Sequence, residues 1–227
     1  MNTASQTLAP RTPRAVHLGW LAMIILASFT SLASARYLVG GALMIPPPLK
    51  PNFLGHSLGF YLHIGSGSLA LLIGGWQFLP AVRRAGGGLH RLLGGLYVTA
   101  CTLGALAALT IAPGTNGGPV AAAGFMTLAI LWLATTWRAL AAILAGDVAG
   151  HRRWIFRSFA LTLAGVTLRL YLPAALLSPY GFSPTYAAIA WLCWVPNLIL
   201  ADPVERWTRL RRVSPRASEA EAWTAGD

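Results

Sequence analysis

The chain has 227 residues, of which 56% are hydrophobic and only 10% are charged. A soluble protein carries roughly 25% charged residues, so this composition excludes an ordinary soluble domain. The apolar residues form long blocks, as in a multi-pass membrane protein whose surroundings are the lipid bilayer. The formal net charge is +11, but no nucleic-acid-binding motif accompanies it, so we expect no nucleic-acid partner.

Six apolar segments come close to or exceed the roughly 20 residues that a bilayer requires. In chain order they are 18–37, 56–82, 90–112, 119–145, 154–177 and 185–201. The sequence therefore predicts an all-α integral membrane protein with a six-helix transmembrane bundle. We expect a cytoplasmic N-terminal segment at 1–17, the membrane domain at 18–204, and a basic, then disordered, cytoplasmic tail at 205–227. Cys101 and Cys193 fall inside apolar segments and are expected to be buried thiols.

Basic residues concentrate in alternate links between these segments, which indicates the orientation of the chain. They precede the first segment, lie in the second-to-third and fourth-to-fifth links, and follow the sixth: Arg11, Arg14, Arg83, Arg84, Arg91, Arg152, Arg153, Arg206, Arg209, Arg211 and Arg212. Both termini are therefore predicted to be cytoplasmic, in a protein of the inner membrane.

The N-terminus allows a second interpretation. Arginines, an apolar stretch and then Ala33-Ser34-Ala35 could form a cleaved signal peptide, which would leave five helices. The apolar stretch is longer than is usual in a signal peptide, which favours a retained helix.

Polar residues inside apolar segments need a reason, because they are costly in a bilayer. The second and third segments each present a histidine followed by mostly small residues on one helical face. These two faces comprise His63, Gly67, Ala70, Gly74 and Gln77, and His90, Gly94, Tyr97, Cys101 and Gly104. Small residues allow close helix packing. They also leave room for a flat ligand such as haem, with a histidine on its iron. The pattern supports either explanation.

The fifth and sixth segments add further polar residues. His151 begins the fifth segment, and Arg157 and Arg169 lie within it; Asn197 lies in the sixth, beside Pro196. His151 and Arg169 are about five turns apart and share a face. Either arginine could instead extend its side chain to the nearer membrane surface.

Helix direction sorts these residues into two predicted clusters. The inner cluster contains His90, His151, Gln77, Arg157 and Asn197, and the outer one His56, His63 and Arg169, with Arg36 as a further candidate. Between residues 18 and 201 the only carboxylate is Asp147, so the intramembrane charge is positive. That charge suits an anionic or carbonyl-bearing ligand: haem propionates, a quinone or a lipid headgroup.

A haem b held by two histidines requires imidazoles from opposite sides of the ring at one depth. His90 and His151 meet that condition at the inner edge, so they are candidate ligands of a haem iron. His63 has no evident partner of this kind. Capping of helix ends by histidines is the structural alternative.

The stretches LHIGSGSLALLIGGWQF, LHRLLGGLYV, HRRWIFRSFALTLAGVTLRLYLP and IAWLCWVPNLILAD resemble a bacterial family of predicted multi-pass membrane proteins whose domain has no known function. The resemblance covers about residues 54–202 and implies the membrane fold without an activity.

A weaker likeness concerns two helices. His63 with Gly67 and Gln77, followed by His90 and Gly94, resembles the core of cytochrome b561-type proteins. That resemblance implies two b haems and electron transfer across the membrane. This sequence departs from the pattern because it lacks a clear fourth histidine ligand.

These observations predict a haem- or quinone-binding membrane redox protein. In this interpretation His90 and His151 contact the ligand, His63 serves the outer side, the two arginines neutralise acidic groups, and Gly67, Gly74 and Gly94 make room. Two alternatives stay open: a transporter or channel for a small solute, and a structural or assembly factor for a membrane complex. The sequence predicts no specific enzymatic reaction and names no protein partner.

Overall fold

The computed structural model describes residues 14–79, 82 and 87–213. Within these residues six helical segments are long and apolar enough to cross a membrane: Leu18–Leu43, Ser57–Phe78, Gly88–Gly114, Gly118–Leu144, Val148–Leu176 and Phe182–Arg209. The prediction of six membrane-spanning segments in an all-α chain is therefore confirmed.

The helices follow one another with short connections. The α-helices are α1 (Arg14–Gly40), α2 (Lys50–Gly55), α3 (Ser57–Gly74), α5 (Gly87–Ile111), α6 (Gly118–Leu144), α7 (Val148–Thr162), α8 (Ala164–Leu176), α9 (Phe182–Leu192) and α10 (Val195–Val213). Short 3-10 helices are η1 (Gly41–Leu43), η2 (Pro47–Leu49), η3 (Gly75–Phe78) and η4 (Ala112–Gly114).

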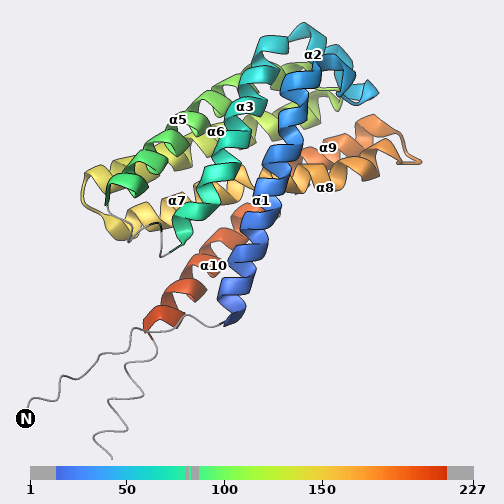
Figure 1. The fold of residues 1–227 in the computed structure, drawn as a ribbon. Coiled ribbons are helices and arrows are strands. Elements are labelled where there is room, and N and C mark those ends of the chain that lie inside the picture. Colours follow the sequence, from blue (N-terminus) through green and yellow to red (C-terminus); the bar gives the residue numbers. More distant parts are fainter. Residues whose placement is uncertain (1–13, 80–81, 83–86, 214–227) are drawn as a thin grey trace, which may run out of the picture.

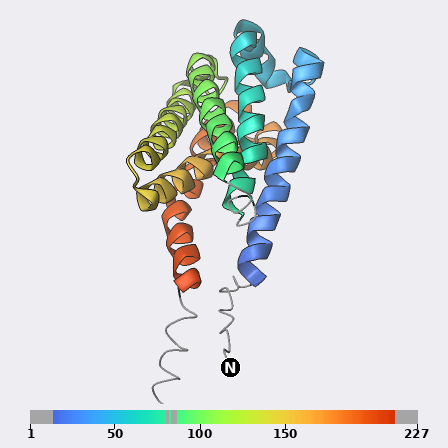
Figure 2. The ribbon, with the colours of Figure 1, turned by 60° about the vertical axis from the view of Figure 1, so that its left-hand side comes forward.

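The spans pack in chain order as a bundle, with α3 against α1 and α5, and α6 against α5 and α7 (Figure 1). The first turn of α1 and the last turn of α10 lie at the same end of the bundle (Figure 2). We call this the basic end, because Arg91, Arg152 and Arg206 are found there, and the opposite one the far end. The placement of the basic end in the cytoplasm stays a prediction.

Large apolar side chains cover the outside of the bundle. They include Leu18, Phe29, Leu32, Leu58, Leu92, Ile130, Leu170 and Ile199, each more than half exposed. In water such a surface would be unfavourable, whereas in lipid it is the expected one. Cys101 and Cys193 are buried free thiols, as predicted.

The fifth and sixth spans are each broken into two helices. In the fifth span Thr162, next to the break at Leu163, bonds back to the Ser158 carbonyl, an interaction that bends helices. In the sixth, Pro196 lacks a backbone N–H, so the ladder is interrupted before α10. Proline in the first turn of α10 is then compatible with a fresh helix start.

Several boundaries differ from the prediction, among them the start of the fifth span and the end of the sixth. The fifth span begins at Val148 rather than at 154, because the Asp147 side chain accepts the Gly150 N–H at 2.7 Å and caps the helix. The sixth continues as helix to Val213, past the predicted end at 201. The predicted disordered tail beyond 213 and the segment at 1–13 lie outside the described residues.

Candidate functional site

A partly open cavity of about 230 Å³ lies in the bundle toward the far end. Its walls come from α1, α3, α6, α7, α8 and α9. Its far-end side comes from the segment between α1 and α3 and from the end of α5 with the link that follows it. Apolar side chains form most of the lining. The polar members are Tyr37, Asn52, His63, Ser68, Thr115, Thr162, Arg169 and Tyr186. The cavity brings together two predicted outer-cluster residues, His63 and Arg169.

His63 lines the cavity with one ring nitrogen already engaged. It lies six residues into α3, so it sits about 9 Å below the start of the helix. Its Nδ1 is 2.9 Å from the Gly104 carbonyl of α5. A carbonyl only accepts, so Nδ1 carries the donated proton, and in the neutral ring Nε2 is an acceptor. No described residue forms a hydrogen bond with Nε2.

Arg169 turns inward rather than toward the far surface. Its Nη1 donates to the Gly165 carbonyl, 2.8 Å away and one turn earlier in α8. Because α8 runs toward the far end, this bond directs the guanidinium back into the bundle. The interpretation that Arg169 extends to the membrane surface is therefore wrong. No carboxylate lines the cavity among the described residues, so the guanidinium has no acidic partner there.

The glycines of the predicted small-residue faces divide into two kinds. A Cβ added at Gly74 would lie 2.7 Å from Phe159, and one at Gly104 would lie 2.9 Å from Ser66 and 3.1 Å from Trp132. These two glycines permit close packing. A Cβ at Gly67 meets nothing within 4 Å, and Gly67 lines the cavity. Only at Gly67, therefore, does the missing side chain leave space that a ligand can use.

Asn52 closes part of the cavity wall and was not predicted. It is 9% exposed, and its Nδ2 donates to the Ile111 carbonyl at 3.0 Å. That bond fixes the orientation of the amide. Its Oδ1 is buried without a hydrogen-bond partner among the described residues. A buried unpaired acceptor is costly, so this atom calls for a donor.

A network of buried hydroxyls lies next to the cavity. Tyr97 Oη is 3.0 Å from Ser158 Oγ and 2.8 Å from Thr162 Oγ1, and Ser158 Oγ is 2.7 Å from Thr136 Oγ1. Trp132 donates its indole N–H to Thr162 Oγ1 at 2.9 Å. These bonds join α5, α6 and α7 and hold one wall of the cavity in place.

Most predicted inner-cluster residues make contacts within the protein. Gln77 donates to the Leu93 carbonyl, and a Cβ on Gly94 would contact its Oε1 at 3.5 Å. Asn197 donates to Thr167 Oγ1 at 3.0 Å and to the Cys193 carbonyl at 3.1 Å. The first of these bonds joins α10 to α8, and the second crosses the break in the sixth span, so both stabilise the fold.

Arg157 is paired with a carboxylate that the sequence interpretation did not assign to it. Its Nε and Nη2 contact Asp202 at 2.9 and 2.6 Å in a bidentate ion pair. Its guanidinium also lies 4.5 Å from the ring centroid of Trp154. Arg157 was predicted to neutralise an acidic ligand. In the structure Asp202, a carboxylate of the protein itself, occupies the place of that ligand. The sequence could have indicated this ion pair, because Asp202 lies only one residue beyond the predicted sixth segment.

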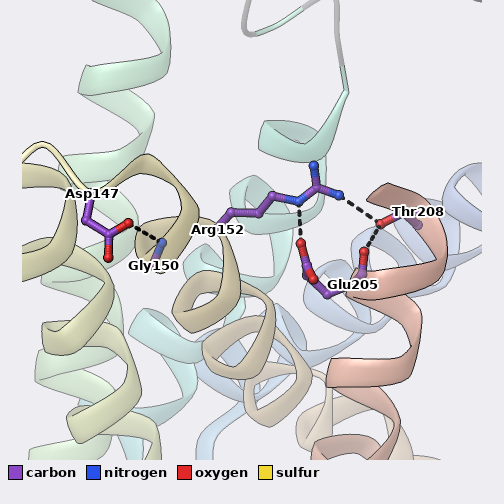
Figure 3. A network of polar contacts seen from close by, with 5 residues as sticks. All are labelled: Asp147, Gly150, Arg152, Glu205 and Thr208. Carbon is purple, nitrogen blue, oxygen red and sulfur yellow. Dashed lines mark hydrogen bonds and ion pairs between the residues drawn. The ribbon is translucent and has the colours of Figure 1, made fainter. Parts of the chain in front are cut away.

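A second ion pair joins the same helices. Arg152 of α7 contacts Glu205 of α10 at 2.8 Å and donates to Thr208 at 3.0 Å (Figure 3). Thr208 in turn donates to the Glu205 backbone carbonyl. Glu205 and Thr208 are both buried. These contacts explain why α10 continues as a helix beyond the apolar segment.

His90 and His151 lie at the basic end and do not line the cavity. His151 Nδ1 donates to the Ala139 carbonyl of α6 at 2.8 Å. This bond leaves Nε2 with the lone pair that a metal ligand needs. A haem b between these two histidines, and with it the cytochrome b561 likeness, stays a prediction.

The cavity itself does not fit a haem with two histidine ligands, because His63 is the only histidine among its lining residues. No group of three or more His, Cys, Asp or Glu side chains suited to a metal ion occurs in the described part of the chain.

Comparison with protein families gives one match. The family of predicted membrane proteins DUF2306, a domain of unknown function, matches residues 60–204. The chain belongs to this family. The matched range contains His63 and Arg169, whereas Tyr37 and Asn52 precede it. Neither the curated proteins nor the solved structures contain a match to this chain.

Proposed function

We propose that this DUF2306 protein binds a quinone-type ring in the far-end cavity, as a redox carrier or cofactor site of the inner membrane. The single observation that carries the proposal is Arg169. It is a guanidinium inside the bundle, turned into a cavity, with no acidic partner among the lining residues. Charged groups in this position face ligand sites by default.

The size and walls of the cavity favour a ring. Pockets for drug-sized molecules have volumes of roughly 300–1,000 Å³, so about 230 Å³ suits a single substituted ring. Aromatic residues contribute much of the lining: Tyr37, Phe60, Phe125, Trp132 and Tyr186. Aromatic walls pack well against a flat ring, and the partial opening would let an isoprenoid tail pass into the lipid.

Other ligands of the same charge fit less well. A lipid phosphate is favoured by several converging cations, and Arg169 is the only Arg or Lys among the lining residues. Haem requires a second axial ligand that these residues do not supply. Quinone oxygens need only one or two donors in an otherwise apolar site, which matches the observed balance.

The first experiment asks whether a quinone is bound. The protein is purified in mild detergent, extracted with organic solvent, and the extract is analysed for isoprenoid quinones by chromatography. The purified protein is then reconstituted in nanodiscs and titrated with a short-tailed benzoquinone, with tryptophan fluorescence as the readout because Trp132 lines the cavity. We expect saturable quenching.

Gly67→Leu should abolish this binding. The new side chain would enter the open space at Gly67, so we expect the affinity to fall at least a hundredfold. The matched control is Gly95→Leu, also on a helix with nothing within 4 Å of the added Cβ but on the exposed surface. Both changes favour helix equally. Equal quenching in both variants and the native chain would contradict the proposed site.

The transporter alternative has its own test. If the protein is a transporter, vesicles containing it should show solute flux that Gly67→Leu does not alter. The protein should then show no saturable quinone binding. Saturable quenching by an anionic phospholipid, with none by the benzoquinone, would instead identify a headgroup site.

A further inference from the structure

The fixed hydrogen-bonding groups of the cavity differ in kind, and this difference bears on the form of the ligand. Arg169 can only donate, and Nη1 is its one nitrogen with a hydrogen bond to a described residue. His63 Nε2 can only accept, because the one proton of the neutral ring is on Nδ1 and is donated to the Gly104 carbonyl.

The role of His63 Nε2 as an acceptor is set by the fold. The Gly104 carbonyl, 2.9 Å from Nδ1, holds the ring proton on that nitrogen. Moving the proton to Nε2 would leave two acceptors, Nδ1 and the carbonyl oxygen, against each other. Tyrosine and serine hydroxyls in the lining can turn to donate or accept, so they impose no preference.

From this pattern we infer that the cavity selects the reduced form of its ligand, a quinol, over the quinone. A quinone oxygen only accepts, so it satisfies Arg169 and leaves His63 Nε2 without a donor. A quinol hydroxyl accepts from the guanidinium and can also donate to this ring nitrogen. An unsatisfied buried acceptor costs binding free energy, so the pattern disfavours the oxidised ring.

This inference rests on the proposed function, since it concerns the ligand of the same site. It goes further by assigning a redox state to the bound ligand, and therefore the direction of electron transfer that the site favours. A site that holds the quinol more tightly stabilises the reduced member of the pair. Bound quinone would then be easier to reduce than free quinone.

Three probes with the same short tail test the inference on the native chain. They are a benzoquinone, its hydroquinone kept reduced under anaerobic conditions, and the dimethyl ether of that hydroquinone. The ether keeps the ring and both oxygens but has no hydroxyl proton. Binding to the protein in nanodiscs is measured by isothermal titration calorimetry. We expect the hydroquinone to bind about tenfold more tightly than the quinone, and the ether to be the weakest.

Variants locate the preference. His63→Leu should reduce the ratio of hydroquinone to quinone affinity toward one, and His63→Gln, which restores an acceptor, should recover part of it. His56→Gln is the control, because His56 is exposed and does not line the cavity. If the leucine variant fails to fold, the comparison of hydroquinone with its ether on the native chain still shows whether binding requires a hydroxyl donor.

The outcomes separate the two proposals. Equal affinities for quinone and hydroquinone, or an ether that binds as well as the hydroquinone, would overturn the inference and leave the quinone-type site standing. Failure of all three probes to bind would instead overturn the proposed function.

Discussion

At the basic end Arg152 and Arg157 of α7 each reach a carboxylate on α10, whereas Arg169 in the next helix reaches only a carbonyl of its own helix. The three arginines belong to one apolar span, Val148–Leu176. Two of them stabilise a helix–helix contact, and one faces a cavity. The comparison shows that an intramembrane charge is informative only once its partners are known.

The histidines differ in a similar way but less sharply. His63 and His151 both donate Nδ1–H to a backbone carbonyl of the neighbouring helix, at 2.9 and 2.8 Å. Only His63 lines the cavity. The same local bond therefore holds both rings, and the space beside each ring distinguishes a ligand contact from a structural one.

The largest effect on stability should come from breaking the more buried ion pair. Glu205→Gln leaves Arg152 without its carboxylate, and the two side chains are only 6% and 26% exposed. We expect a loss of about 2 kcal/mol in the free energy of unfolding, because an uncompensated charge remains. Unfolding in detergent would show a lower midpoint, while benzoquinone affinity stays unchanged. A drop in affinity without a drop in stability would contradict the division between the two ends.

Arg169→Leu should give the opposite result. The change removes a charge that has no acidic partner among the cavity-lining residues, so we expect stability to be retained or raised. Affinity for the ring should fall about tenfold, equal to about 1.4 kcal/mol. Arg169→Lys, the control, keeps the charge but not the planar fork and should retain part of the affinity. Titration and unfolding on the same preparations check both quantities. A stability loss as large as that of Glu205→Gln would indicate that Arg169 is structural.

Hydrophobic periodicity was sufficient to predict the six spans, because a bilayer imposes both length and composition on each segment. The same pattern predicted the outer cluster in part. His63 lies six residues after the start of α3 and Arg169 lies seven residues before the end of α8, so both are at a similar depth from the far end. It could not predict that Gly67 is open while Gly74 is packed. Both are glycines on one helix face, and only the neighbours of Gly74, Phe159 and Tyr97, distinguish them.

The partners of Arg152 and Arg157 were missed for a different reason. Asp202 and Glu205 lie beyond the apolar stretch, so a search confined to the membrane segments excludes them. Asn52 was missed because it precedes the second span, in a segment that contributes to the cavity only through the tertiary fold. Residues that are adjacent in space but lie on separate elements leave no pattern in one sequence.

The smallest expected effect on stability concerns the more exposed of the two ion pairs. The Arg157 and Asp202 side chains are 28% and 38% exposed, so solvent screens their attraction. Asp202→Asn should cost less than about 1 kcal/mol, and the cost should shrink further in high salt. A double-mutant cycle with Arg157→Leu, measured by unfolding at low and high ionic strength, isolates the pair from the contact of Arg157 with Trp154. A coupling as large as the Glu205 effect and independent of salt would mean that the bidentate geometry outweighs exposure. The strength of both ion pairs would then be set by geometry rather than by burial.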